Sequence, residues 1–370
     1  MTISAEASRR RFRIRPGQSI AQVGDAEREI PADQRTALGR SSYTALLDSD
    51  NGDLKVVNDR ARSMIEELGL QPEWRPRRES SPDELRLLAL LVLEGIVEVE
   101  IDRGFVTGAY AMEALGLPFP PTGEETPTGR LSMQALRHVQ RLGLVQKHEL
   151  AARLYFFNRI PRSKRWLANW PDRRAVLRSL GRSVDVLAGT FVYGETADGA
   201  WAHWRRQDRT GADASGDFKL YVSAHPADVG GAFGAVARSV ASAPAHALKI
   251  GLNAGSLLRP DKIVVYFKRQ GDLAEYAAAL LPEIDGARPQ GVPFSGALDE
   301  NGLLSWGFDP PADVKEAGVY PDRSWRIWLC NRLASAIVET PADADPIRFA
   351  LTRIAAAGVD TAEWAPVDSQ

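Results

Sequence analysis

Three short segments between residues 218 and 268 alternate apolar and polar side chains, which is the two-residue period of a β-strand. In the first segment, Phe218, Leu220 and Val222 fall on one face, while Lys219 and Tyr221 fall on the other. The other two segments repeat this separation: Leu248, Ile250 and Leu252 oppose Lys249, Gly251 and Asn253, and Ile263, Val265 and Phe267 oppose Lys262, Val264, Tyr266 and Lys268. If the three strands share a sheet, one face packs on helices such as residues 228–240 and the other face is cationic.

One β-hairpin is predicted in the N-terminal half. Residues 81–84 (Ser-Pro-Asp-Glu) match a capping box with proline in the first turn, and the apolar residues 85–93 then form a buried helix. The alternation that follows, across residues 96–107, predicts two short strands joined by a turn. A helix followed by a hairpin has the shape of a winged-helix or leader-peptide-recognition module, and it fits a purely structural hairpin equally well.

The rest of the chain has mainly helical spacing. The helical pattern begins at Tyr43, and amphipathic helices are predicted at residues 131–142, 149–157, 173–187 and 346–358. The charged segment 205–216, rich in Gly and Ser, predicts a domain boundary.

These patterns predict three parts of the chain. We expect a flexible lead-in at residues 1–40, a mostly helical N-terminal domain at residues 41–210, and a compact domain at residues 216–370. The predicted fold class is α+β, with a helical N-terminal half that contains a small β-hairpin and a C-terminal β-sheet that helices cover on one face.

Charge and composition exclude several classes of partner. The chain has 46 basic and 48 acidic residues and a formal net charge of -2, so no global field attracts nucleic acid or a membrane. A single cysteine, Cys330, excludes an intramolecular disulfide, and the five histidines lack metal-ligand spacing, so we expect neither a metal nor a cofactor. The basic run at residues 9–15 lacks the apolar stretch of a secretory signal, which predicts the cytoplasm.

A basic segment with two tryptophans follows the second of the predicted amphipathic helices. Arg162, Lys164 and Arg165 stand beside Trp166 and Trp170. This composition suits a groove for a peptide or a phosphate, with guanidinium planes over indole rings. It also suits an exposed basic loop that its tryptophans pack onto the protein, and the sequence leaves both interpretations open.

The cationic face of the predicted sheet has two interpretations as well. Lysines on a strand commonly face solvent, which needs no function. However, Arg259-Pro260-Asp261 precedes the third strand, and arginine supplies a planar fork for phosphate, while a crowded lysine is driven toward its neutral form. That combination suits proton abstraction beside an anion. The sequence offers no phosphate-loop, dinucleotide or nucleophile-elbow motif in support of nucleotide binding or serine-type catalysis.

The C-terminal half resembles the HopA effector family over about residues 216–340, through the ordered motifs FKLYVS, ALKIG, LLRPDKIVVYF, GVPFSGAL, LSWGFDPP and SWRIWLCNRLASAIV. The ending, residues 349–366, is also similar. The resemblance implies elimination of phosphate from phosphoserine or phosphothreonine to give dehydroalanine or dehydrobutyrine, as in the class V lanthipeptides and thioamitides. A more remote resemblance, to phosphothreonine lyases, is carried by the order of Lys249, Arg259 and Tyr266.

This resemblance implies roles for individual residues. Lys249 is expected to remove the weakly acidic Cα proton, with Arg259 in the phosphate clamp. Lys219, Tyr266 or His225 is expected to assist as acid or cation.

One position departs from the family pattern. Leu329 stands where the family has an arginine. Arg326 or Arg323, about one helical turn away, is expected to complete the phosphate clamp in its place. Without that compensation the clamp is incomplete, and binding without catalysis becomes the alternative.

The predicted function is therefore phosphate elimination from a ribosomally made precursor peptide, which a separate Ser/Thr kinase of the same pathway phosphorylates. Two alternatives remain open: a non-catalytic module that binds the peptide or the kinase, and a nucleotide-using transferase. The edge of the hairpin at residues 96–107 predicts that the N-terminal half binds the unphosphorylated part of a peptide or a partner protein. No nucleic acid or membrane partner is expected.

Overall fold

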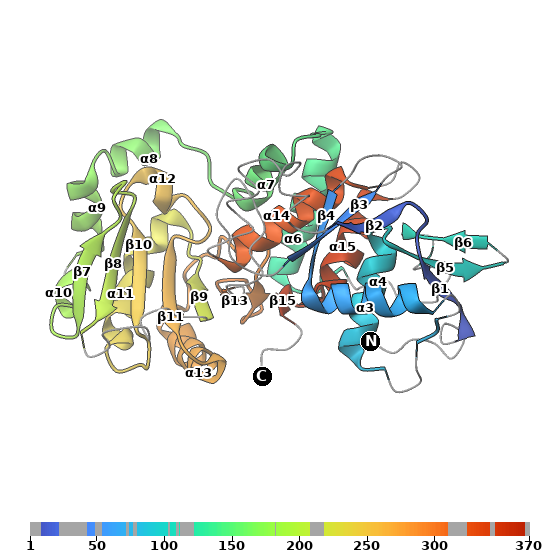
Figure 1. The fold of residues 1–370 in the computed structure, drawn as a ribbon. Coiled ribbons are helices and arrows are strands. Elements are labelled where there is room, and N and C mark those ends of the chain that lie inside the picture. The colour runs from blue at the N-terminus through green and yellow to red at the C-terminus, as the bar shows by residue number, and fades with distance from the viewer. Residues whose placement is uncertain are drawn as a thin grey trace. The chain divides into compact units, whose positions relative to one another are not determined.

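The computed structural model in Figure 1 describes residues 9–21, 43–48, 54–71, 74–76, 80–102, 104–108, 111, 122–181, 183–207, 218–309, 324–340 and 345–366. The fold class is α+β, as predicted. The chain divides into two compact units. The first unit comprises Met1–Pro121, Pro311–Asp322 and Asn331–Val359, and the second comprises Thr122–Pro310, Arg323–Cys330 and Asp360–Gln370.

The first unit combines two small antiparallel sheets with helices. One sheet has the order β1-β5-β6, formed by β1 (Phe12–Ile14), β5 (Val97–Ile101) and β6 (Gly104–Val106). The other has the order β2-β3-β4, formed by β2 (Gln18–Ala21), β3 (Tyr43–Asp48) and β4 (Leu54–Asn58). The helices of this unit include α3 (Asp59–Leu70), α4 (Pro82–Leu93) and α15 (Pro346–Ala356).

Two predictions for the first unit are confirmed. The side chain of Ser81 accepts a hydrogen bond from the backbone N–H of Glu84, and the Glu84 side chain accepts one from the backbone of Ser81, which completes the capping box of α4. The hairpin follows as β5 and β6, with Val99 opposite Val106. Gly95, in the left-handed conformation at φ 72°, lets the chain turn from the helix into the hairpin.

Two other predictions for this unit are wrong. The segment from Tyr43 forms a strand, because it pairs with β2 on one side and β4 on the other, and the helix begins only at Asp59. The segment at residues 1–40, which was predicted to be flexible, contains an ordered strand, because Phe12 is fully buried in β1 and pairs with Val99. The flanking Arg11 pairs with Glu100, so charged side chains line the opposite side of that strand.

The second unit is built on a seven-stranded antiparallel sheet with the order β12-β13-β9-β11-β10-β8-β7. Its strands are β7 (Phe191–Glu195), β8 (Trp201–Arg206), β9 (Phe218–Val222), β10 (Ala247–Gly251), β11 (Ile263–Phe267), β12 (Gly296–Ala297) and β13 (Leu304–Phe308). The three strands predicted from the alternating segments are neighbours, as expected. Lys249 lies opposite Val264, and Val264 lies opposite Tyr221.

The helices of the second unit include those predicted between residues 131 and 187. They are α6 (Pro127–Leu142), α7 (Lys147–Tyr155), α8 (Lys164–Asn169), α9 (Arg173–Leu180), α10 (Ser183–Val186), α11 (Val229–Val240), α12 (Ala254–Leu257), α13 (Gln270–Leu280) and the beginning of α14 (Trp325–Val338). The segment 127–186 thus belongs with the sheet and not with the first unit, where the sequence had placed it. None of the described helices is long and apolar enough to cross a membrane.

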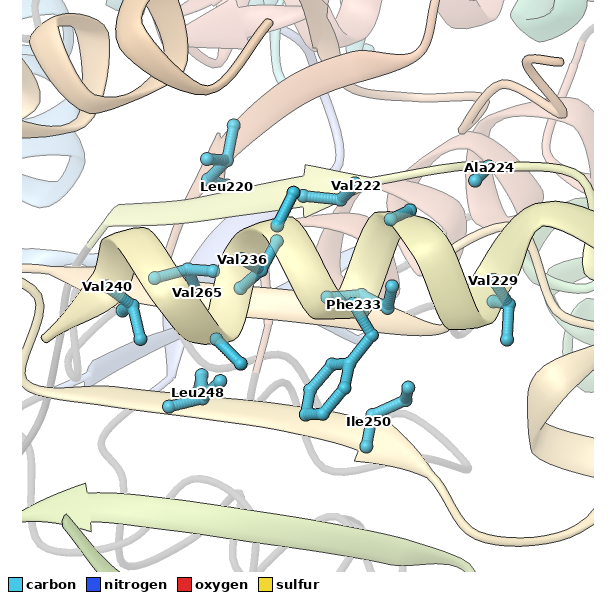
Figure 2. Close-up of a cluster of buried hydrophobic side chains, with 14 of the residues drawn as sticks. Leu220, Val222, Ala224, Val229, Phe233, Val236, Val240, Leu248, Ile250 and Val265 are labelled. Carbon is cyan, nitrogen blue, oxygen red and sulfur yellow. The ribbon is translucent and has the colours of Figure 1, made fainter. Parts of the chain in front are cut away.

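One face of the large sheet carries the main core of the second unit. Figure 2 shows α11 lying along this face, with Phe233 and Val236 near the side chains of Leu248, Ile250 and Val265. All of these side chains are fully buried. The apolar face predicted from the alternation is therefore confirmed, and its burial supplies the main hydrophobic stabilisation of this unit.

The opposite face of the sheet is not a solvent face along β9 and β11. Lys219, Tyr221 and Val264 are buried there, and Val292 from the loop before β12 packs on Tyr221 and Val264. Polar groups on this face are consequently shielded from water, which strengthens their mutual interactions.

Replacement of Phe233 by alanine is expected to lower the free energy of unfolding of the second unit by about 3–5 kcal/mol, because it leaves a cavity between α11 and the sheet. Urea unfolding followed by tryptophan fluorescence measures this loss. Of the 9 tryptophans, only Trp74 belongs to the first unit, so the signal reports mainly on the second.

Val192→Ala is the control, because Val192 on β7 is 57% exposed and its truncation should change stability by about 0.5 kcal/mol or less. An equal effect of the two substitutions would contradict the position of Phe233 in the core.

Candidate functional site

A buried carboxylate, Asp261, organises the opposite face of the large sheet. It is 7% exposed and stands just before β11. Its Oδ1 accepts a hydrogen bond from Arg259 Nε at 2.8 Å, and its Oδ2 accepts from Arg259 Nη2 at 2.8 Å and from Arg326 Nη1 at 2.9 Å. Burial alone would raise the pKa of Asp261, but the two guanidinium groups outweigh it and hold the pKa far below its usual range.

Arg259 is held rigidly by this carboxylate and by aromatic rings. Besides its two bonds to Asp261, Nη2 donates to the hydroxyl of Tyr155 at 2.5 Å. The guanidinium carbon lies 5.1 Å from the ring centroids of Tyr155 and Trp201, and 5.5 Å from that of Phe156. Within the described residues, Nη1 makes no hydrogen bond, so two N–H donors of Arg259 remain for a ligand.

Lys249 stands next to this arginine on β10 and is half-buried. Its Nζ lies 4.7 Å from the ring centroid of Trp201 and 5.8 Å from that of Tyr266. In the part of the chain that the structure describes, Lys249 forms no hydrogen bond and no ion pair. Burial lowers the pKa of Lys249, the Asp261 carboxylate partly opposes this effect, and Arg259 adds to it. Such an amine is suited to accept a proton.

Lys219 and Tyr266 complete this part of the face. They lie opposite each other on β9 and β11, and Lys219 Nζ lies 5.6 Å from the Tyr266 ring centroid. Lys219 forms an ion pair with Asp309, just after β13. Burial raises the pKa of Tyr266 to about 12, against the opposing effect of Lys219, so its hydroxyl is a proton donor at neutral pH. Tyr266 thus stands between the two lysines.

Arg326 does not have the position predicted for a phosphate ligand. At the start of α14 it is 1% exposed, and its Nε and Nη2 donate to the carbonyl oxygens of Pro293 and Tyr155, each at 2.9 Å. Its side chain therefore holds Asp261 in place and presents no surface to a ligand. Leu329, one turn later, is fully buried in the same helix. Arg323, the other predicted replacement, lies outside the described residues.

His225 is also not brought to Lys249. It follows the end of β9 by three residues, where its Nδ1 accepts a hydrogen bond from the backbone N–H of Ala227 at the start of a turn of 3₁₀-helix. Its ring lies 5.9 Å from that of Trp166. Among the described residues, the side chain of His225 contacts this turn and Trp166, and it forms no hydrogen bond or ring contact with Lys219 or Lys249. We therefore remove it from the candidate site.

A network of half-buried amides positions the segment that carries Tyr155. Asn158, in the left-handed conformation at φ 63°, donates from Nδ2 to the carbonyl oxygens of Gln290 at 2.6 Å and Gly291 at 2.9 Å. Gln290 Nε2 donates back to Asn158 O at 2.6 Å, and its Oε1 accepts from Lys262. Burial lowers the pKa of Lys262 to about 7. The turn after α7 is therefore fixed against the sheet.

Several residues of the site were not singled out from the sequence. Trp201 lies under both Lys249 and Arg259, and the sequence signal that could have revealed it is the alternation of Trp201, His203 and Arg205 with buried Ala202 and Trp204. His203 lies directly opposite Lys249. Tyr155 and Asp309 have no local signal, because tertiary contacts alone bring them here. Cys330 is buried, which raises its pKa to about 12, so its thiol is inert at neutral pH.

No protein-family model and no curated protein sequence matches the chain. Among solved structures, the effector protein from Pseudomonas syringae pv. syringae strain 61 is 11% identical with a TM-score of 0.44, and the match covers 66% of this chain and 98% of that one. The effector protein from Pseudomonas syringae pv. tomato strain DC3000 is 12% identical with a TM-score of 0.43, covering 66% and 99%. The phosphothreonine lyase SpvC from Salmonella is 14% identical with a TM-score of 0.28, covering 48% and 93%.

These three structures, two effector proteins and a phosphothreonine lyase, are each similar to part of this chain.

Replacement of Asp261 by asparagine is expected to cost about 3–5 kcal/mol of stability, because it leaves the buried Arg326 without a counter-charge. The lowered pKa of Asp261 means that its contribution is fully present above the unfolded-state pKa of about 3.9 and is lost as the pH falls below that value. Urea unfolding between about pH 7 and pH 3 should therefore show a steeper acid loss for the parent protein than for Asp261→Asn.

Asp272→Asn is the matched control. Asp272 pairs with the exposed Arg269 at 3.3 Å, a surface pair worth about 0–1 kcal/mol. Equal stability losses from the two substitutions would show that Asp261 does not anchor the site.

Proposed function

We propose that the protein eliminates phosphate from phosphoserine or phosphothreonine in a peptide, as a carbon–oxygen lyase. The observation that carries this proposal is the pairing of Lys249 and Arg259 over one indole ring. Lys249 is an amine with a lowered pKa and no hydrogen-bond partner among the described residues, and Arg259 is an oriented guanidinium with donors to spare. A base beside a fixed anion-binding group is what β-elimination of phosphate requires.

In the proposed reaction, the Cα–H bond of the phosphorylated residue breaks and its proton passes to the neutral amine of Lys249. The electron pair of that bond forms the Cα=Cβ double bond, and the Cβ–O bond breaks with its electrons leaving on the phosphate. Phosphoserine gives dehydroalanine and phosphothreonine gives dehydrobutyrine, each with one inorganic phosphate. Lys249 then returns the proton to solvent.

The neighbouring groups support separate parts of this reaction. Arg259 binds the phosphate through Nη1, because Nε and Nη2 are engaged by Asp261 and Tyr155. Lys219, paired with Asp309, stabilises the negative charge that develops on the carbonyl of the substrate. The neutral hydroxyl of Tyr266 can donate to the leaving phosphate oxygen.

We further propose that the substrate is a ribosomally made precursor peptide, phosphorylated by a separate Ser/Thr kinase of the same cytoplasmic pathway, and that the product belongs to the lanthipeptide or thioamitide class. The HopA-like motifs at residues 216–340 support this context. The face of the sheet with Lys219, Lys249 and Tyr266 would take the phosphorylated residue, and the hairpin formed by β5 and β6 would take the unphosphorylated part of the peptide.

A second candidate is a module that binds the phosphopeptide without reacting. It is favoured by Leu329, which stands where the family pattern has an arginine, and by Arg326, whose donors are engaged inside the protein. With leucine at position 329 and Arg326 engaged by Asp261, Arg259 is left to bind the phosphate among the candidate clamp residues that the structure describes.

Mass spectrometry of a phosphothreonine peptide incubated with the protein tests the proposal. Elimination removes the elements of phosphoric acid, so the product is lighter by one water than the simply dephosphorylated peptide. An unchanged mass with measurable binding would support the binding module. A gain of mass in the presence of a nucleotide would instead support a transferase.

Replacement of Lys249 by alanine is expected to reduce kcat by about 10²-fold or more, because a general base acts in the transition state, while phosphopeptide affinity stays within a few-fold of the parent. Single-turnover elimination and calorimetric binding measure the two effects. Lys147→Ala, which removes an exposed lysine at the start of α7, is the charge-matched control and should leave both quantities unchanged. Parent-like turnover of Lys249→Ala would remove this residue from the mechanism.

The pH dependence should follow from the same amine. Because burial lowers the pKa of Lys249, the neutral fraction increases with pH, and kcat/KM should rise and then level off below the ordinary lysine value of 10.5. The profile is best measured above about pH 7, where the phosphate is already a dianion. A rate that falls with pH in this range would contradict a lysine base.

A further inference from the structure

The strand β7 forms one outer edge of the large sheet. It pairs with β8 on one side and with no other described strand on its second side (Figure 1). The backbone N–H of Gln207 donates to the carbonyl oxygen of Thr190 at 3.1 Å, just before β7. The backbone N–H of Thr196, just after β7, donates to the carbonyl oxygen of Trp201 at 3.0 Å. These two bonds fix which backbone groups of β7 face β8.

Alternate residues of β7 direct their backbone groups out of the sheet. In an antiparallel pair every second residue bonds to the neighbouring strand, so Val192 and Gly194 face β8 between the two bonded ends. The N–H and C=O groups of Tyr193 and Glu195 therefore point outward. They form no hydrogen bond with the residues that the structure describes. Such a row of outward donors and acceptors is complementary to the backbone of one more extended chain.

This edge lacks the features that usually protect an edge strand, such as a proline, a lysine or a bulge. β7 has the sequence FVYGE, and its register with β8 runs without interruption. Its one charged residue, Glu195 at the end of the strand, pairs with Arg173. The apolar side chains of Val192 and Tyr193 are 57% and 41% exposed. An edge of this kind is suited to pair with an extended partner.

The edge is continuous with the face that carries Lys249. Gly194 lies opposite His203, and His203 lies opposite Lys249, so these residues form one row across three strands. A Cβ added to Gly194 would lie 2.5 Å from His203 Nε2, so the imidazole ring lies against Gly194. Burial lowers the pKa of His203, and the charges of Arg205 and Lys249 lower it further, while Glu195 opposes them. The ring is therefore neutral at neutral pH and can bond to the backbone of a peptide that crosses it.

We propose that the edge of β7 binds an extended segment of the substrate peptide as an additional strand of the sheet. The proposal rests on the proposed function for the identity of that peptide. Neighbouring strands are about 4.8 Å apart, so the added strand would lie about 14 Å from β10, which carries Lys249. An extended chain advances about 3.3 Å per residue, so the paired segment begins about four residues from the phosphorylated residue. The substrate class is thus a peptide recognised through its backbone on one side of that residue.

Calorimetric binding to the full-length Lys249→Ala protein provides the test, because this variant is not expected to consume the peptide. The probe is a phosphothreonine peptide with about ten residues on each side, along which a single backbone N-methyl group is moved one residue at a time. A methyl group on an N–H that faces β7 removes a hydrogen bond and prevents close approach. Affinity should therefore fall about tenfold at every second residue, beginning about four residues from the phosphothreonine on one side. Methyl groups on the residues between them point away from β7 and should change affinity by about twofold or less.

A pair of substitutions in β7 gives a second measurement on the same background. Tyr193→Pro removes the outward N–H at the middle of the strand, and Tyr193→Ala is its control, because it removes the same ring but keeps that N–H. The proline variant should bind the long peptide about tenfold more weakly than the alanine variant. A phosphothreonine peptide with about two residues on each side does not reach the edge, so both variants should bind it within about twofold of the Lys249→Ala protein. The N-methyl series needs no change in β7, so it decides the question even if the proline variant does not fold.

Equal affinity along the whole N-methyl series would overturn the added strand, as would equal binding of the long peptide by folded Tyr193→Pro and Tyr193→Ala. A dimer that Tyr193→Pro converts into a monomer, measured by analytical ultracentrifugation, would overturn it too, because the edge would then belong to a second copy of this chain. The proposed elimination fails separately, through an unchanged peptide mass in the parent protein, while the alternating pattern of affinities persists.

Discussion

The arrangement of the second unit's polar face depends on one buried carboxylate. Asp261 binds one arginine two residues away in the chain, Arg259, and another 65 residues away, Arg326. Removing three charged groups from water is costly, and the cost is offset only when the geometry satisfies all of them together. The bonds of Asp261 to Arg259 fix the direction of that guanidinium group. The bond of Asp261 to Arg326 holds the start of α14 against the sheet. Arg259 is thereby oriented before any ligand arrives, which reduces the entropy lost on binding.

The sequence predicts those parts of the fold that the residue pattern of a short segment determines by itself. The strict alternation around Lys219, Lys249 and Tyr266 identifies three strands and separates their two faces, because a one-residue slip would exchange core and polar side chains. β1 was not predicted because Phe12 is buried by contacts with residues far along the chain: it pairs with Val99 and its ring packs on that of Trp74. β3 was missed for a related reason, since its pairing with two strands overrides a helical spacing of apolar residues.

The residues of the candidate site are likewise predictable from the sequence only in part. The motif order indicates Lys249, in the middle of β10, and Arg259, four residues before β11. It cannot tell whether Arg326 faces a ligand or a buried carboxylate, because that depends on which acid reaches it in the fold. Nor can it tell that Tyr155, 104 residues before Arg259, supplies a hydroxyl to the same guanidinium. Contacts of this range are set by packing of the whole unit, and no short segment encodes them.

The two aromatic rings beside Lys249 have a chemical consequence for the proposed product. Dehydroalanine and dehydrobutyrine are electrophilic alkenes, and a free amine in their vicinity is a nucleophile that can add to them. Immediately after proton abstraction, however, Lys249 is an ammonium, and the faces of Trp201 and Tyr266 favour that cation electrostatically. An ammonium has no lone pair with which to attack. In the proposed reaction the rings would thus favour the form of Lys249 that cannot add to the alkene, until its proton passes to solvent.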